Sequence, residues 1–94
     1  MADIDIYTEA IKTFGALPQM VVAIEECSEL QKEIVKIIRK RGDLTNLAEE
    51  IADVEIMLEQ LKLIFTVHDK VIEQKGRKIE RLKWTIEKYK GKQA

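Results

Sequence analysis

Residues that end helices are rare in this chain. Pro18 is the only proline, and the four glycines stand at positions 15, 42, 76 and 91. The long segments between them are rich in Glu, Lys, Ile, Leu, Ala and Gln, most of which favour helices. No segment shows the two-residue alternation of apolar and polar side chains that is typical of a strand. The sequence therefore predicts an all-α fold.

Stop signals divide the first half of the chain into two predicted helices. The first covers residues 3–14 and ends at Gly15, a residue type that commonly follows a helix. The second covers residues 18–41 and has Pro18 in its first turn, where the missing N–H costs nothing. Basic residues near its end suit the helix dipole, and Gly42 is expected to close it.

Two further helices are predicted in the second half. Asn46, with Glu49 three residues later, predicts a capping box at the start of a helix over residues 46–66. The last helix covers residues 69–90, and its apolar side chains nearly follow a seven-residue repeat. The expected architecture is one domain, residues 1–94, forming a four-helix bundle with an antiparallel central pair.

The short length predicts self-association. A chain of this size buries only about two-thirds of its unfolded surface, so its own core is thin. A homo-oligomer would supply the missing burial. No stretch is long and uncharged enough to span a membrane, and the N-terminus lacks signal-peptide features. The single cysteine, Cys27, cannot form an internal disulfide, which favours a reducing, cytoplasmic location.

Charge is distributed unevenly along the chain. Residues 1–60 carry 13 acidic and 6 basic side chains, whereas residues 61–94 carry 4 acidic and 10 basic ones. An acidic first part and a basic last part suit a site that holds a cation together with a polyanion. The alternative is that the two parts of the chain simply attract each other. Nucleic-acid binding is not expected, because the whole chain has a net charge of −1 and no recognised motif.

Several carboxylates lie where apolar side chains are expected. On a helical wheel of residues 18–41, Glu29 and Glu33 lie within about 60° of Glu26, and all three line the edge of the apolar face. In the next helix, Glu50 lies inside the apolar arc and Asp53 at its margin. An unpaired ionised carboxylate there would cost several kcal/mol, so a lysine, a proton or a metal ion must compensate.

The spacing favours a metal ion without deciding for it. Glu26 and Glu29 are three residues apart, as are Glu50 and Asp53, so each pair shares one face of its helix. An antiparallel hairpin would bring the pairs together, and four adjacent carboxylates would require cations. Oxygen ligands select a hard ion such as Mg²⁺ or Mn²⁺. Buried Glu–Lys pairs between the helices are the alternative.

The motif also resembles a known family. Glu25, Glu26 and Glu29 form an EExxE motif, which is followed after twenty residues by the ExxD motif of Glu50 and Asp53. This pattern resembles the signature of the MazG-like all-α nucleoside triphosphate pyrophosphohydrolases, in particular their short single-domain members. The similarity extends from about residue 18 to residue 66.

The resemblance implies a fold, a reaction and a set of metal ligands. It implies a helical bundle that assembles as a homodimer or homotetramer. It also implies Mg²⁺-dependent hydrolysis of a nucleoside triphosphate to the monophosphate and pyrophosphate, as in nucleotide-pool housekeeping. By match to the motif, Glu26, Glu29, Glu50 and Asp53 would be the metal-binding and catalytic residues. Glu33 lies outside the signature but is expected to face the site.

Substrate-binding residues are predicted among the cations. They would stabilise the departing pyrophosphate, and Gln19 would hydrogen-bond the base. The candidate cations are Lys78 and Arg81, from the same or a neighbouring subunit, with Lys75, Lys32 and Lys36. Each could equally be a solvated surface residue. Phe14 and Trp84 could stack on a base, although aromatic residues at helical spacing are more often part of a core.

Two other functions compete with hydrolysis. The chain could be a non-catalytic helical interaction protein with a purely structural acidic cluster. Against this, such a helix has little reason to place Glu50 inside its apolar stripe. A di-iron carboxylate bundle would need Glu-x-x-His pairs, and neither acidic motif here contains histidine.

Overall fold

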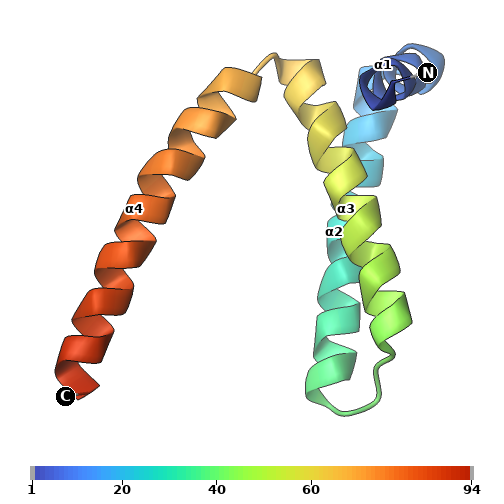
Figure 1. Cartoon of the computed structure of the whole chain (residues 1–94). Coiled ribbons are helices and arrows are strands. Elements are labelled where there is room, and N and C mark those ends of the chain that lie inside the picture. Colours follow the sequence, from blue (N-terminus) through green and yellow to red (C-terminus); the bar gives the residue numbers. More distant parts are fainter. Residues whose placement is uncertain (1, 94) are drawn as a thin grey trace.

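Four helices account for most of the chain. The computed structural model describes residues 2–93 (Figure 1). Its helices are α1 (Asp3–Phe14), α2 (Ala16–Ile38), α3 (Leu44–Phe65) and α4 (His68–Gln93). Residues 2–93 contain no strand, so the predicted all-α class is confirmed. Within the same range, no helix is both long and apolar enough to cross a membrane.

The turn after α2 differs from the prediction. α2 ends in a Schellman motif, in which the N–H of Arg41 donates to the carbonyl of Lys36 at 2.9 Å. Lys40 takes the left-handed conformation, with φ of 60°, at the position where glycine is usual. Gly42 instead permits close packing, since a Cβ atom there would lie 2.5 Å from Cδ1 of Ile37. The prediction that Gly42 closes the helix was therefore wrong.

The start of α3 also differs from the prediction. The carboxylate of Asp43 accepts a 2.7 Å hydrogen bond from the N–H of Thr45, which makes Asp43 the N-cap. The predicted capping box of Asn46 and Glu49 was wrong, because Asn46 already lies in the first turn. Both Asp43 and Asn46 have side chains that can cap a helix. Asp43 takes this role because it directly follows the tight turn.

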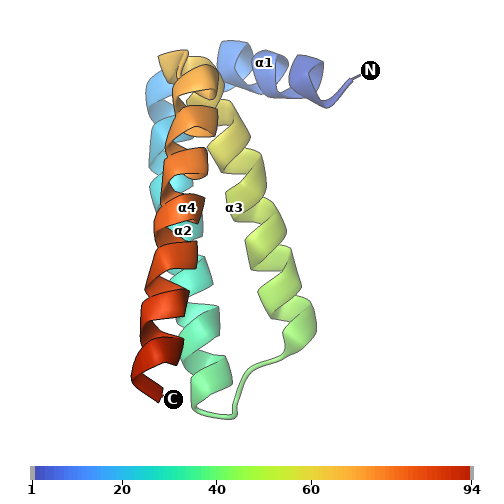
Figure 2. The same ribbon diagram turned by 60° about the vertical axis from the view of Figure 1, so that its left-hand side comes forward.

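The central pair is antiparallel, as predicted, and it encloses a small core. α2 and α3 run side by side in both views (Figures 1 and 2). Between them the buried apolar side chains are Ala23 and Met57. The amide of Gln19 donates a 2.7 Å hydrogen bond to Gln60, and both residues are buried. The pairing of two buried amides satisfies polar groups that would otherwise destabilise the interface.

The last helix does not pack along this pair. α1 lies across the end of the pair, whereas α4 contacts α3 alone and leans away (Figure 1). The radius of gyration is 17.1 Å, against about 12 Å for a compact domain of this length. Large apolar side chains of α4 are exposed, among them Ile72, Ile79, Leu82 and Ile86. The four-helix bundle is thus open within one chain.

Candidate metal centre

Three carboxylates from two helices converge near the middle of the central pair. Glu26 comes from α2, and Glu50 and Asp53 come from neighbouring turns of α3. Each offers one oxygen atom, and these atoms all lie within 4.8 Å of one another. Glu26 and Glu50 are half-buried, and Asp53 is exposed. One side of the group therefore opens to solvent, which gives a ligand access.

The protonation behaviour of the group reflects this crowding. Burial raises the pKa of Glu26, and the charges of Asp53 and Glu50 raise it further. Burial also raises the pKa of Glu50, with added repulsion from Asp53, Glu29 and Glu33. Because oxygens of Glu26, Glu50 and Asp53 lie within 4.8 Å of one another, a proton on Glu26 would be shared within the group. Three adjacent carboxylates thus hold a proton or a cation more readily than isolated ones would.

The lysines that the structure describes do not neutralise this group. Within residues 2–93, none of the ion pairs involves Glu26, Glu50 or Asp53. The Oε2 atom of Glu50 is buried and has no hydrogen-bond partner. The alternative of buried Glu–Lys pairs is therefore not realised at these three residues. An orphaned carboxylate oxygen beside two other carboxylates fits a hard divalent cation, which prefers oxygen ligands.

Glu29, the fourth ligand expected from the motif, lies outside the group. Its Oε1 atom forms an exposed 3.3 Å ion pair with Nζ of Lys32, one turn further along α2. The negative charge of Glu29 nevertheless adds to the repulsion that raises the pKa of Glu50. Glu29 is thus placed to influence the centre from its solvent edge.

The predicted substrate-binding cations are scattered over the molecule. Lys32 pairs with Glu29, and Lys36 pairs with Glu33 at 3.1 Å, so both lie on α2 near the centre. The other three, Lys75, Lys78 and Arg81, are exposed on α4. Since α4 does not contact α2, one chain does not bring Lys78 or Arg81 to the carboxylates.

The other residues that were singled out from the sequence lie outside the carboxylate group. Gln19 is buried, and its side-chain amide is hydrogen-bonded to Gln60, so this amide is not free to face the carboxylates. Cys27 is exposed. His68 is the first residue of α4. Trp84 is exposed, and Nζ of Lys88 lies 4.7 Å from the centre of its ring.

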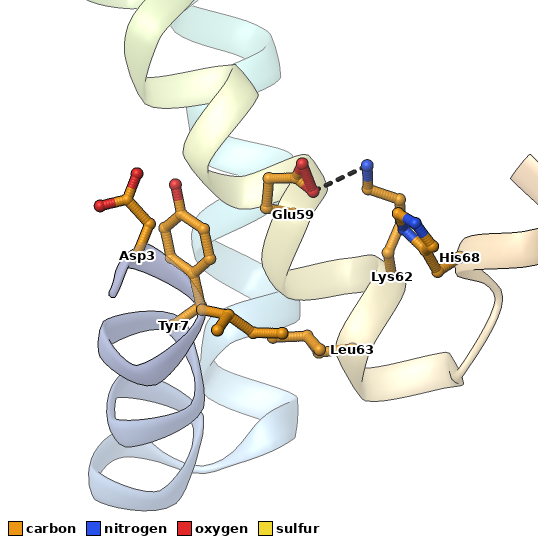
Figure 3. Close-up of a pocket in the computed structure, with 7 residues that line it drawn as sticks. Asp3, Tyr7, Glu59, Lys62, Leu63 and His68 are labelled. Atoms are coloured by element: carbon orange, nitrogen blue, oxygen red, sulfur yellow. Dashed lines mark ion pairs between the residues drawn. The ribbon is translucent and has the colours of Figure 1, made fainter. Parts of the chain in front are cut away.

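A cavity of about 520 Å³ lies elsewhere, between α1, α3 and the start of α4 (Figure 3). Tyr7 and His68 line it, together with Glu59 and Lys62, which form a 2.7 Å ion pair. Glu59 lies about 180° from Glu50 on the wheel of α3. This cavity is therefore on the opposite side of the helix from the carboxylate group and is separate from the candidate centre.

Comparisons with known proteins add no assignment. No protein-family model matches the chain, and neither the curated proteins nor the solved structures contain a match. The MazG-like resemblance therefore depends on the two acidic motifs and on the geometry that brings Glu26, Glu50 and Asp53 together.

A second group of side chains was not recognised from the sequence. A pocket of about 390 Å³ at the α2–α3 turn is lined by Glu33, Lys36, Arg39, Arg41 and Asn46, among others. The basic run of residues 39–41 was interpreted only through Lys40 and Arg41, as residues that suit the dipole at a helix C-terminus. Its proximity to a buried glutamate depends on the Schellman turn, which the sequence pattern did not predict.

Proposed function

We propose that this protein is a Mg²⁺-dependent nucleoside triphosphate pyrophosphohydrolase, with Mn²⁺ as a possible substitute. The observation that carries the proposal is the convergence of Glu26, Glu50 and Asp53 within 4.8 Å, with an orphaned buried oxygen on Glu50. The products would be a nucleoside monophosphate and pyrophosphate, in keeping with the resemblance. The role would be nucleotide-pool housekeeping, in the cytoplasm.

The residues of the candidate metal centre would have different roles in the reaction. Glu26, Glu50 and Asp53 would hold the cation, which supplies charge neutralisation for the polyphosphate when bound. Glu29, exposed at the edge of the group, would act as a further ligand or accept a proton from the attacking water. Lys32 and Lys36 lie on the same helix and would stabilise phosphate oxygens by charge-assisted hydrogen bonds.

A second copy of the chain would complete the molecule. The exposed apolar side chains of α4 and the open arrangement of the helices support a homodimer or homotetramer. In such an assembly, α4 of one copy would lie along the α2–α3 pair of another. Lys78 and Arg81 would then reach the carboxylates of the partner, and the basic half of one chain would face the acidic half of the other.

The test is a panel of standard and damaged nucleoside triphosphates with Mg²⁺, scored for pyrophosphate release. Glu50→Gln removes the orphaned ionised oxygen and is expected to lower turnover more than about 100-fold. Glu55→Gln is the matched control, because Glu55 is an exposed residue on the far side of α3. Full activity of Glu50→Gln would overturn the catalytic assignment.

The second candidate function is helical assembly without catalysis. The exposed apolar face of α4 favours it independently of the carboxylates. It predicts a stable oligomer that releases no pyrophosphate from any triphosphate in the panel. Retained assembly together with absent turnover would therefore favour this candidate.

A further inference from the structure

The last helix presents most of its positive charge to solvent. α4 carries nine Lys and Arg residues and four acidic ones, a balance of +5 in a chain whose net charge is −1. It contacts α3 alone and leans away from the acidic α2–α3 pair (Figure 1). Its 26 residues extend over about 39 Å. The net charge of the whole chain therefore hides a long and accessible basic helix.

Part of this charge lies in one row along α4. On a helical wheel, Lys70, Arg77, Trp84 and Lys88 fall within about 40° of one another, and all four side chains are exposed. We call these four residues the basic ridge. They are separated by seven, seven and four residues, so the ridge is about 27 Å long. Arg81 borders the ridge but is not counted in it, because it is a proposed substrate contact of the metal centre.

The cations of the ridge have no acidic partner. Within residues 2–93, none of the ion pairs involves Lys70, Arg77 or Lys88. The acidic side chains of α4 lie along one edge of the ridge and are Asp69, Glu73, Glu80 and Glu87. The ridge cations are therefore available to anionic oxygens of another molecule.

An aromatic ring interrupts the row of cations. Trp84 is 60% exposed, and Nζ of Lys88 lies 4.7 Å from the centre of its ring. The apolar stripe that contains Ile72 and Ile79 is about 120° or more away around α4, so burial of that stripe would leave Trp84 exposed. An exposed ring among unpaired cations is the combination that binds the bases and phosphates of a nucleic-acid strand.

Other polyanions fit the ridge less well. Helices that lie on a membrane surface bury a broad apolar face, whereas Trp84 is the one apolar side chain of the ridge. An acidic protein would pair with the cations but would give the ring nothing to stack on. In a duplex, the bases are already stacked on each other. A single strand supplies phosphates for the cations and an unpaired base for the ring.

We propose that the basic ridge binds single-stranded nucleic acid, with phosphate groups on Lys70, Arg77 and Lys88 and one base stacked on the exposed ring of Trp84. The binding would tolerate any base sequence, since every base has a ring face. It does not depend on the proposed hydrolysis, because the carboxylates lie on other helices. The net charge of the chain did not predict it, since the acidic first sixty residues offset the charge of α4.

The first test uses the fluorescence of Trp84, which is the only tryptophan of the chain. The full chain is titrated with an oligothymidylate of about twelve nucleotides, with a chelator present to remove divalent ions. Stacking should quench the fluorescence. Three phosphate contacts should give a slope of about −2 for the logarithm of affinity against the logarithm of salt concentration. Unchanged fluorescence at low salt, or equal quenching by a duplex of the same length, would overturn the proposal.

Alanine variants test the cations of the ridge. Lys70→Ala and Arg77→Ala should each weaken binding about fivefold and reduce the salt slope by about 0.7. The matched control is Lys90→Ala, which removes an equal charge from an exposed residue on the side of the apolar stripe and should leave both values unchanged. Alanine favours the helix, and circular dichroism checks that it is kept. An equal loss in Lys90→Ala would refute the ridge.

Aromatic variants test the stacking contact, with the anisotropy of a dye-labelled oligothymidylate as the readout. Trp84→Ala should weaken binding about tenfold, whereas Trp84→Phe should keep most of the affinity. Full affinity in Trp84→Ala would contradict stacking on this ring. Vesicles of phosphatidylglycerol and phosphatidylcholine test the lipid alternative by sedimentation. Binding of the chain to these vesicles, but not to the oligothymidylate, would overturn the proposal.

The proposed hydrolysis and the strand binding can be tested separately. Glu50→Gln should bind the oligothymidylate as tightly as the unmodified chain, because Glu50 lies on α3. A chain that binds the strand but hydrolyses no triphosphate would support this inference and contradict the proposed function. A chain that hydrolyses triphosphates but does not bind the strand would do the reverse.

Discussion

Gln19 on α2 and Gln60 on α3 are joined by a buried 2.7 Å hydrogen bond between their side-chain amides. Gln60 also donates towards the sulfur of Met57 at 3.7 Å. These contacts lie in the small core between the two helices that carry the carboxylates. The register of α2 against α3, and with it the distance between Glu26 and Glu50, therefore depends on this amide pair.

The first prediction concerns this amide pair. Gln60→Ala would leave the amide of Gln19 buried without its partner and open a small cavity. The expected loss in the free energy of unfolding is about 1–3 kcal/mol. Urea denaturation at fixed protein concentration measures it. The double substitution Gln19→Leu with Gln60→Leu should cost less than Gln60→Ala, since no polar group remains unsatisfied; a larger cost would contradict the packing role of the pair.

The second prediction is a pH dependence of stability. The pKa values of Glu26 and Glu50 are raised in the fold, so the folded protein binds protons more readily than the unfolded chain. The stability that these groups contribute is present below their ordinary pKa and is lost as the pH rises through the raised values. The metal-free protein should therefore have a lower melting temperature at about pH 8 than at about pH 4, just below the ordinary pKa of a glutamate.

Divalent cations should reverse this loss. Mg²⁺ binds the ionised carboxylates, so it should raise the melting temperature at about pH 8 and much less at about pH 4. In Glu50→Gln, both the pH dependence and the Mg²⁺ effect should shrink, whereas Glu55→Gln should behave as the unmodified chain. A Mg²⁺ effect of equal size at both pH values would argue against ligation by these carboxylates.

The third prediction separates motif from geometry. The acidic signature gives Glu26 and Glu29 equal standing, but Glu29 is outside the group and pairs with Lys32. Glu26→Gln should therefore weaken Mn²⁺ binding by about tenfold or more, and Glu29→Gln by clearly less. Isothermal titration with Mn²⁺ alone gives both values. Equal losses for the two variants would show that Glu29 joins the ligands when the ion binds.

The sequence predicted the acidic centre because a carboxylate inside an apolar arc is a strong physical signal. Glu50 has no compensating lysine on its own helix, and the antiparallel pairing then brings Glu26 to it. Glu29 was less predictable, because its offset of about 60° from Glu26 points it towards solvent and Lys32. A helical wheel does not distinguish the two edges of an apolar stripe, whereas the partner helix covers only one of these edges.

Other features depend on contacts that no single helix encodes. The cap at Asp43 and the left-handed Lys40 follow from how tightly the turn folds against Ile37. The direction of α4 could not be predicted either. Its near-heptad apolar stripe indicates that the helix packs against something, but it does not indicate which surface. Within one chain that stripe stays exposed, for example at Ile79.

The last prediction tests whether α4 completes the centre of a second copy. Glu50→Gln should be inactive because it lacks one carboxylate of the centre. The double variant Lys78→Ala with Arg81→Ala should be inactive because it lacks the contacts to phosphate. Mixing the two inactive proteins under conditions that allow exchange of subunits should restore activity to about a quarter of the unmodified level. Half of the dimers would be mixed, and one of their two sites would combine an intact Glu50 with an intact α4.

The outcome depends on which chain supplies the basic residues. If Lys78 and Arg81 served the carboxylates of their own chain, no mixed dimer would contain an intact site, and activity would stay absent. Disruption of the apolar stripe by Ile79→Asp gives an independent check, because it should convert the oligomer to monomers in sedimentation analysis. A monomeric Ile79→Asp protein with full turnover would show that the open arrangement of one chain suffices for catalysis.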